Sequence, residues 1–144
     1  VEICGVNTSK LPLLKNADQA VLDTGQLAGT LKGVTKALEL VGPKTIKDTL
    51  WCVEKGGIVC NTGILGGIYA LNGFDPIKNI PNGVYLTGFF SNYPTQDAIL
   101  DIFAFLERYN LKPAVGAKYD FEQIKDACAA LESGSVNGKI VVRV

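Results

Sequence analysis

The fold is decided by residues 35–63, which read TKALELVGPKTIKDTLWCVEKGGIVCNTG. This stretch predicts a strand, a helix and a second strand in turn, with the bounds 35–42, 43–57 and 57–63. The helix is indicated by Ile46, Leu50 and Val53, which recur at helical spacing and would share one apolar face. The second strand is short and almost entirely apolar, as is typical of a strand that is covered on both faces.

Strand and helix signals alternate along the rest of the chain as well. Further strands are expected at 1–6, 19–23, 83–90 and 138–144, and further helices at 9–17, 25–33, 95–110 and 120–134. Parallel strands need a crossover connection, which is usually helical. The alternation therefore predicts an α/β fold with a doubly wound, mostly parallel sheet and helices on both of its faces.

The composition narrows the class of partner. The chain has 144 residues, 47% of them hydrophobic, which predicts one domain with a proper core. Its 14 basic and 14 acidic residues give a formal charge of zero, so neither nucleic acid nor an anionic membrane is an expected partner. The apolar runs are too short for a membrane helix and the N-terminus does not resemble a signal peptide, so we expect a cytoplasmic protein.

The absence of histidine and the spacing of the cysteines argue against metal binding and against two kinds of nucleophilic catalysis. The chain contains no histidine, and its four cysteines at 4, 52, 60 and 128 have no metal-binding spacing. We therefore expect free, mostly buried thiols, no metal site, and neither Ser-His-Asp nor Cys-His catalysis. The chain also contains no methionine, which leads us to expect a fragment or a separated domain.

Ligands of doubly wound sheets bind outside the carboxyl ends of the strands. In this sequence those ends are residues 7–9, 41–43, 62–66 and 87–90. One of them lies within GGIVCNTGILGG (56–67), which is rich in glycine but opens no helix and lacks the G-x-G-x-x-G pattern. We therefore do not expect this stretch to be a pyrophosphate-binding loop.

Three segments together resemble a known family. They are ALELVGPKTIKDTLWCVEKGGIVCNTGILGG (37–67), GVYLTGFF (83–90) and LKPAVGAKYDFEQIKDACAALESGSVNGKIVVRV (111–144). Their order is similar to the C-terminal part of the medium-chain dehydrogenase/reductase superfamily, in its zinc-independent quinone oxidoreductase branch. The resemblance implies an incomplete Rossmann-like fold whose first strand and glycine-rich loop are absent. Residues 1–144 would belong to the NAD(P)-binding domain, with about 111–144 returning toward a catalytic domain.

The same resemblance implies a function. It is hydride transfer from NADPH to a quinone, enone or related carbonyl substrate, with no metal and no catalytic residue within this chain. NADPH is preferred to NADH because no acidic residue follows the first strand, where Ser9 and Lys10 could bind a 2'-phosphate. Without a pyrophosphate loop, we expect the chain alone to be inactive.

Fifteen residues are assigned to the cofactor by this resemblance. Those near the adenosine are Asn7, Thr8, Ser9, Lys10, Val41 and Gly42; those near the nicotinamide are Thr62, Gly63, Ile64, Leu65, Gly88, Phe89 and Phe90; and those in the final turn are Asn137 and Gly138. Each has a simpler alternative role: a helix cap or solvated charge, a strand-to-helix turn, a structural turn, or core packing for the two aromatic residues.

Alternatives remain open for the function and for the assembly. A methyltransferase-like domain also has a Gly-Gly turn before a strand, although its last strands usually form an antiparallel hairpin. A non-catalytic nucleotide-binding or interaction remnant is the second alternative. Strand 83–90 carries no charge and no proline, and by resemblance it lies at a sheet edge, so we expect a homodimer through this strand. Residues 68–82 could instead cover that edge within the monomer.

Overall fold

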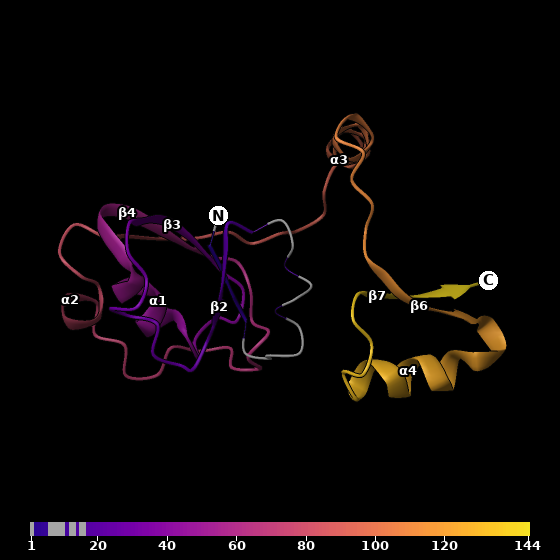
Figure 1. Cartoon of the computed structure of the whole chain (residues 1–144), viewed down its shortest axis with the longest axis horizontal. Helices are drawn as coiled ribbons and strands as arrows, with labels where there is room; N and C mark the ends of the chain where they lie inside the picture. Colours follow the sequence, from indigo (N-terminus) through magenta and orange to yellow (C-terminus); the bar gives the residue numbers. More distant parts are fainter. Residues whose placement is uncertain (1, 6–10, 12–13, 15–16) are drawn as a thin grey trace. The chain divides into compact units, whose positions relative to one another are not determined.

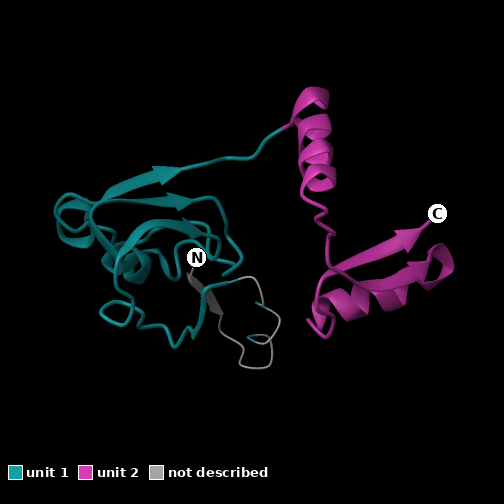
Figure 2. Cartoon of the chain, turned by 45° about the horizontal axis from the view of Figure 1, so that its top comes forward, with its two compact units in different colours: residues 1–92 teal, residues 93–144 magenta. Residues whose placement is uncertain are grey.

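The residues described by the computed structural model are 2–5, 11, 14 and 17–144. The chain divides into two compact units, residues 1–92 and residues 93–144, which Figure 2 shows in separate colours. All of the strand pairs in the described residues are parallel. The predicted α/β class with parallel strands is therefore confirmed.

The centre of the first unit is a three-stranded sheet with the order β3-β4-β5. Its strands are β3 (Val34–Glu39), β4 (Val53–Asn61) and β5 (Tyr85–Gly88). Helix α1 (Ile46–Cys52) connects β3 to β4 and packs against both strands (Figure 1). The strand, helix and strand predicted from residues 35–63 are thus present.

The core of this unit lies between α1 and one face of the sheet. Leu50 of α1 and Val59 of β4 have no exposed surface, and Ile46 is only 2% exposed. Ile46 and Leu50 are one helical turn apart, so both face the sheet, where Val53 and Val84 complete the cluster. Burial of each such side chain contributes roughly 1.5–3 kcal/mol.

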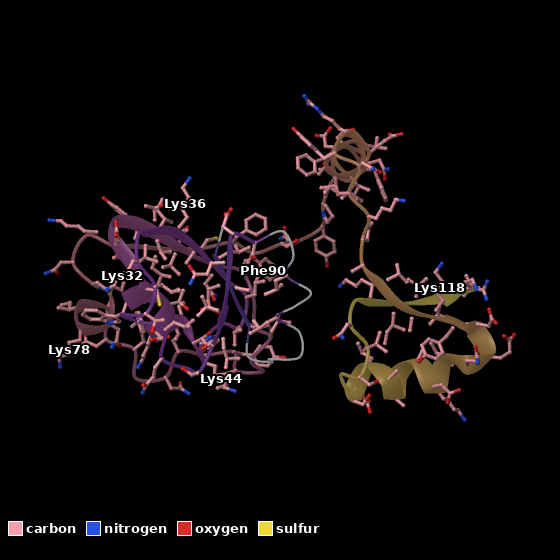
Figure 3. The ribbon with its side chains drawn as sticks, in the orientation of Figure 1. Lys32, Lys36, Lys44, Lys78, Phe90 and Lys118 are labelled. Carbon is pink, nitrogen blue, oxygen red and sulfur yellow. The ribbon has the colours of Figure 1, made fainter. Side chains whose placement is uncertain are left out.

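The opposite face of the same sheet is open within the first unit. Lys36, Ile58 and Tyr85 lie directly across from one another on the three strands. Lys36 projects from the sheet into solvent (Figure 3), and Tyr85 is 62% exposed. Leu38, the next residue on this face of β3, is 65% exposed. Within this unit α1 therefore covers one face of the sheet only.

A second, two-stranded sheet is formed by β1 (Glu2–Gly5) and β2 (Gln19–Leu22). Within the described residues, neither strand pairs with β3, β4 or β5. The separate sheets agree with the incomplete Rossmann-like fold that the resemblance implies. The predicted helix 9–17 lies largely outside the described residues.

The helix predicted over residues 25–33 is not formed, and the segment makes turns instead. Its three glycines, Gly25, Gly29 and Gly33, all have positive φ, at 84°, 84° and 69°. A right-handed helix requires negative φ at every residue. Glycines in the left-handed region therefore prevent the helix that was predicted here.

Helix α1 is shorter and β4 longer than the sequence predicts. The helix ends at Cys52 because Val53 is already extended, with φ −96° and ψ 138°. Val53 has a β-branched side chain that is buried in the core, which favours the strand conformation. Gly56, which falls within the predicted helix 43–57, lies instead within β4 with φ at 89°. The long connection after β4 contains one short helix, α2 (Pro76–Asn79), capped by Asp75.

The second unit contains α3 (Gln96–Arg108), β6 (Val115–Asp120), the short 3-10 helix η2 (Phe121–Gln123), α4 (Ile124–Glu132) and β7 (Lys139–Arg143). The pairing of β6 with β7 is supported at its far end by an ion pair of 2.7 Å between Arg143 and Asp120. The sequence analysis predicted α3, α4 and β7 but did not predict β6. Cys128 was expected to be buried on α4, but it is exposed.

Within the part of the chain that the structure describes, no helix is long and apolar enough to cross a bilayer.

Candidate functional site

The carboxyl ends of β3, β4 and β5 lie next to one another at one edge of the sheet. Glu39 of β3 is in register with Asn61 of β4, and Asn61 is in register with Gly88 of β5. The three strands run parallel, so the loops that follow them leave the sheet at the same edge. This arrangement brings together three of the predicted groups, residues 41–42, 62–65 and 88–90.

The loop after β4 is bonded to the end of β3 through the main chain. The amides of Thr62 and Gly63 both donate to the carbonyl of Glu39, at 3.0 and 3.2 Å. Further along, Leu65 N donates to Leu40 O at 3.0 Å, and Gly66 N donates to Val41 O at 2.9 Å. The two loops therefore form one hydrogen-bonded layer at the sheet edge.

Glycine is required where these two loops meet. Gly42 has φ at 89°, and a Cβ on it would lie 2.5 Å from the carbonyl oxygen of Gly63. A Cβ on Gly63 would overlap the backbone of Leu40, and one on Gly66 would lie 3.0 Å from Val41 O. Gly63 and Gly66 of the 56–67 stretch thus serve first to let two pieces of backbone pack together. Any close approach of a ligand is a separate use of the same loop.

The end of β5 joins this layer through one hydrogen bond, from Phe89 N to Asn61 O at 3.0 Å. The side chains of Phe89 and Phe90 are 62% and 84% exposed, and Phe90 is labelled in Figure 3. Within the first unit these rings do not serve core packing, which was the alternative considered for them. Ile64 and Leu65 are also exposed, at 47% and 81%. Four large apolar side chains therefore face outward at the strand ends.

Glu39, which was not among the predicted site residues, is a buried polar residue at this edge, with 5% of its surface exposed. Its Oε1 accepts hydrogen bonds from the amides of Val41 and Gly42, at 2.8 and 3.0 Å. The hydroxyls of Thr45 and Thr49, one turn apart on α1 and its cap, also bond to the carboxyl group. The sequence offered one signal for this role: an acidic residue within the apolar segment ALELV, followed by Thr45 and Thr49.

Asn61 is the second residue that the sequence analysis did not identify. Its Oδ1 is fully buried and has no hydrogen-bond partner in the described part of the chain. Buried side-chain oxygens nearly always accept a hydrogen bond, so an unused acceptor at a strand end is notable. A polar residue closing an apolar strand was its only sequence signal.

Two predicted groups lie outside the described residues or in the second unit. Asn7, Thr8, Ser9 and Lys10 lie outside the described residues. Asn137 and Gly138 belong to the second unit, where Gly138 has φ at 107° and Lys139 N donates to Ala114 O at 2.7 Å. A Cβ on Gly138 would lie 2.6 Å from that carbonyl, so this turn needs glycine in order to start β7. A role in cofactor binding stays a prediction for both groups.

Within the described residues, no three cysteine, aspartate or glutamate side chains lie close enough together to hold a metal ion.

Comparison with known proteins gives one family. A family model described as zinc-binding dehydrogenase matches residues 15–142. No curated protein matches the sequence.

Several solved structures share the fold. An NAD-dependent alcohol dehydrogenase is similar with a TM-score of 0.77 and 20% identity, over 100% of this chain and 43% of that chain. A quinone oxidoreductase from Thermus thermophilus, solved also in complex with NADPH, is similar with a TM-score of 0.73 and 22% identity, over 100% of this chain and 49% of that chain. The Bacillus subtilis protein yhfP with NAD bound is similar with a TM-score of 0.73 and 23% identity, over 100% of this chain and 46% of that chain. The chain thus spans less than half the length of these proteins.

Proposed function

The chain belongs to the zinc-binding dehydrogenase family of the medium-chain dehydrogenases/reductases, and we propose that it is the NADPH-binding part of a quinone or enone oxidoreductase. In this proposal the complete protein transfers a hydride from NADPH to a quinone or another carbonyl substrate. The chain spans less than half of its structural relatives, so the activity is proposed for the complete protein. This chain alone is expected to turn over little or no substrate.

One observation carries the proposal, namely the hydrogen-bonded layer at the carboxyl ends of β3, β4 and β5. Parallel sheets of this class bind ligands at that edge. The layer combines backbone held close by glycines with exposed apolar side chains, among them Leu65 and Phe90. Flat rings such as nicotinamide and adenine bind well to apolar surfaces that also offer backbone hydrogen bonds.

The donors and acceptors of this edge fit a nicotinamide cofactor. Asn61 lies at this edge with the exposed strand ends, but its Oδ1 is fully buried and so is not offered to a ligand in this conformation. The Thr62 hydroxyl, beside it, can donate or accept. When bound, NADPH supplies the hydride, and the protein supplies orientation and exclusion of water. We assign no catalytic residue to this chain.

We propose that the reaction does not use zinc. The resemblance to the zinc-independent branch supports this, and these 144 residues offer no zinc ligand set of their own, since they contain no histidine and their four cysteines are far apart in sequence. We also propose that the complete protein is cytoplasmic, because the apolar runs of these 144 residues are too short for a membrane helix.

A homodimer through β5 is part of the proposal. Strand β5 lies at the end of the order β3-β4-β5, so one of its edges has no strand partner within the described residues. An uncharged edge strand readily pairs with the same strand of a second copy around a two-fold axis.

The test of the proposed function is an NMR titration of the chain with NADPH and, separately, with NADH. We expect weak binding, in which the amides of residues 41–42, 62–65 and 88–90 shift and those of α3 serve as an internal reference. NADPH should bind more tightly than NADH. Absence of any shift at these amides at millimolar NADPH would contradict the proposal.

A second candidate is a non-catalytic interaction module. It is favoured by the open face of the sheet, where Leu38, Ile58 and Tyr85 are 65%, 41% and 62% exposed. A surface of this kind is unusual on a monomer that has no partner. The two candidates differ in the NADPH titration, because an interaction module without nucleotide binding would give no shift at the strand ends.

A further inference from the structure

Glu39 connects the two loops of the proposed cofactor site. Its side chain bonds to the turn after its own strand, through the amides of Val41 and Gly42. Its main-chain carbonyl accepts the amides of Thr62 and Gly63, which begin the loop after β4. One residue therefore holds both loops, each through a different group.

The side chain of Glu39 is fully used by these contacts. Oε1 accepts from two amides and from the Thr45 hydroxyl, at 2.8, 3.0 and 2.9 Å, and Oε2 is bonded to the Thr49 hydroxyl. Burying a carboxyl group is unfavourable unless such partners satisfy it. An apolar residue would fill the same space without that cost. The group therefore stabilises a particular loop conformation rather than the core as such.

The turn that Glu39 holds is also in steric contact with the second loop. A Cβ on Gly42 would lie 2.5 Å from the carbonyl oxygen of Gly63, and a Cβ on Gly63 would overlap the backbone of Leu40, which precedes the turn. If the turn at 41–42 relaxes, the surface against which Gly63 packs must move as well. The hydrogen bonds from Leu65 to Leu40 and from Gly66 to Val41 would be strained by the same movement.

We propose that Glu39 is a positioning residue for the cofactor site, which sets the turn at 41–42 and, through it, the loop at 62–66. This proposal rests on the proposed function, because that function is what makes the two loops a cofactor site. The coupling between the two loops can be measured without any ligand. Glu39 itself touches neither cofactor nor substrate in this assignment.

The test uses the 144-residue chain with Glu39→Leu and Glu39→Gln. Glutamine keeps one oxygen that can accept from the two amides. Its N–H group can donate to the Thr49 hydroxyl. That hydroxyl lies 3.3 Å from the Thr45 carbonyl oxygen and can donate to it instead. Leucine removes every one of these contacts. The matched controls are Glu54→Leu and Glu54→Gln, because Glu54 is an exposed glutamate on the neighbouring strand.

The measurement is amide hydrogen exchange, residue by residue, under conditions where the chain stays folded. For Glu39→Leu we expect exchange at Gly63, Leu65 and Gly66 to rise about tenfold or more, the size expected when a buried hydrogen bond is lost. The amide of Leu50 in α1 should change much less. Glu39→Gln should stay near wild type, as should both Glu54 variants.

Several outcomes would overturn the inference. One is a folded Glu39→Leu chain with unchanged exchange at residues 62–66. Another is a uniform rise at all amides, since this would mean that Glu39 contributes only to global stability. If Glu39→Leu does not fold, Thr49→Val decides the matter. This variant removes one partner of the carboxyl group and should raise exchange at 41–42 and 62–66 but not in β5, and no change at these positions would overturn the proposal.

The two proposals can fail separately. If the wild-type chain shows no NADPH-dependent shifts, the proposed function is contradicted, whereas the exchange data still report on the coupling between the loops. If NADPH binds, Glu39→Leu should weaken binding and Glu39→Gln should restore it. Equal NADPH affinity in wild type and a folded Glu39→Leu would contradict the positioning role.

Discussion

Gly42 and Gly63, on two different loops, pack backbone against backbone at the carboxyl edge of the sheet. A Cβ on Gly42 would lie 2.5 Å from the carbonyl oxygen of Gly63, and a Cβ on Gly63 would overlap the backbone of Leu40. Rigid backbone cannot give way as a flexible side chain can. The loops after β3 and β4 therefore behave as one structural element.

The first prediction concerns this contact. Gly63→Ala should lower the free energy of unfolding by about 1–3 kcal/mol, because the added methyl group forces two backbone segments apart. Urea denaturation measures the change. The control is Gly88→Ala, where the nearest atom to the new Cβ would be Asn61 O at an ordinary 3.8 Å. Equal stability losses for the two variants would contradict the prediction.

The second prediction concerns the choice of cofactor. Lys10 lies outside the described residues, but it follows the first strand, where the resemblance assigns the adenosine ribose. Lys10→Glu should reduce or reverse the preference for NADPH over NADH, since a charge-assisted phosphate contact contributes about 1.5–3 kcal/mol. Calorimetric titration of the complete protein with both cofactors measures the ratio.

The control for this measurement is Lys36→Glu, which makes the same change of charge on the open face of the sheet. It should leave the ratio of the two dissociation constants unchanged. Equal affinity of the wild type for NADPH and NADH would exclude the assignment of a 2'-phosphate site.

The third prediction concerns activity. At micromolar concentration, this chain should oxidise NADPH with a simple quinone far more slowly than the roughly 10 per second of an ordinary enzyme. The physical reason is that no G-x-G-x-x-G loop is present in these 144 residues to hold the pyrophosphate. A steady-state absorbance assay with and without chain measures the rate. Turnover near 10 per second would refute the prediction.

The fourth prediction concerns the dimer. Tyr85→Lys should shift the chain toward monomer, because it places charge beside the edge where two copies of β5 would pair. Light scattering at tens of micromolar measures the mass. Tyr69→Lys is the matched control, since Tyr69 is 80% exposed and lies outside the strands.

Leu86→Lys, on the same strand, should not replace Tyr85→Lys in this experiment. Leu86 packs against the buried cluster around Leu50 and Val59, so a lysine there would destabilise the fold itself. A wild-type chain that is monomeric at the same concentration would contradict the dimer.

Local sequence signals correctly predicted the helices that have strong apolar periodicity. They failed for segments whose secondary structure depends on backbone conformation or strand pairing elsewhere in the fold. The helices that became α1, α3 and α4 were predicted from apolar residues one turn apart. The expected helix at 25–33 is not formed, because its glycines adopt positive φ. Strand β6 was not predicted because its residues show no clear alternation, and its conformation depends on pairing with β7.

The sequence by itself determined the α/β class, the β3-α1-β4 unit and the family, because these depend on periodicity and on motifs that are continuous in the chain. It also predicted that ligands bind at the strand ends, and this stays a prediction. Only the tertiary structure decided that Gly42 meets Gly63 and that the carboxyl group of Glu39 is buried among four donors. Those relationships join residues of separate loops and elements, and close packing between distant segments leaves no periodic pattern in a single sequence.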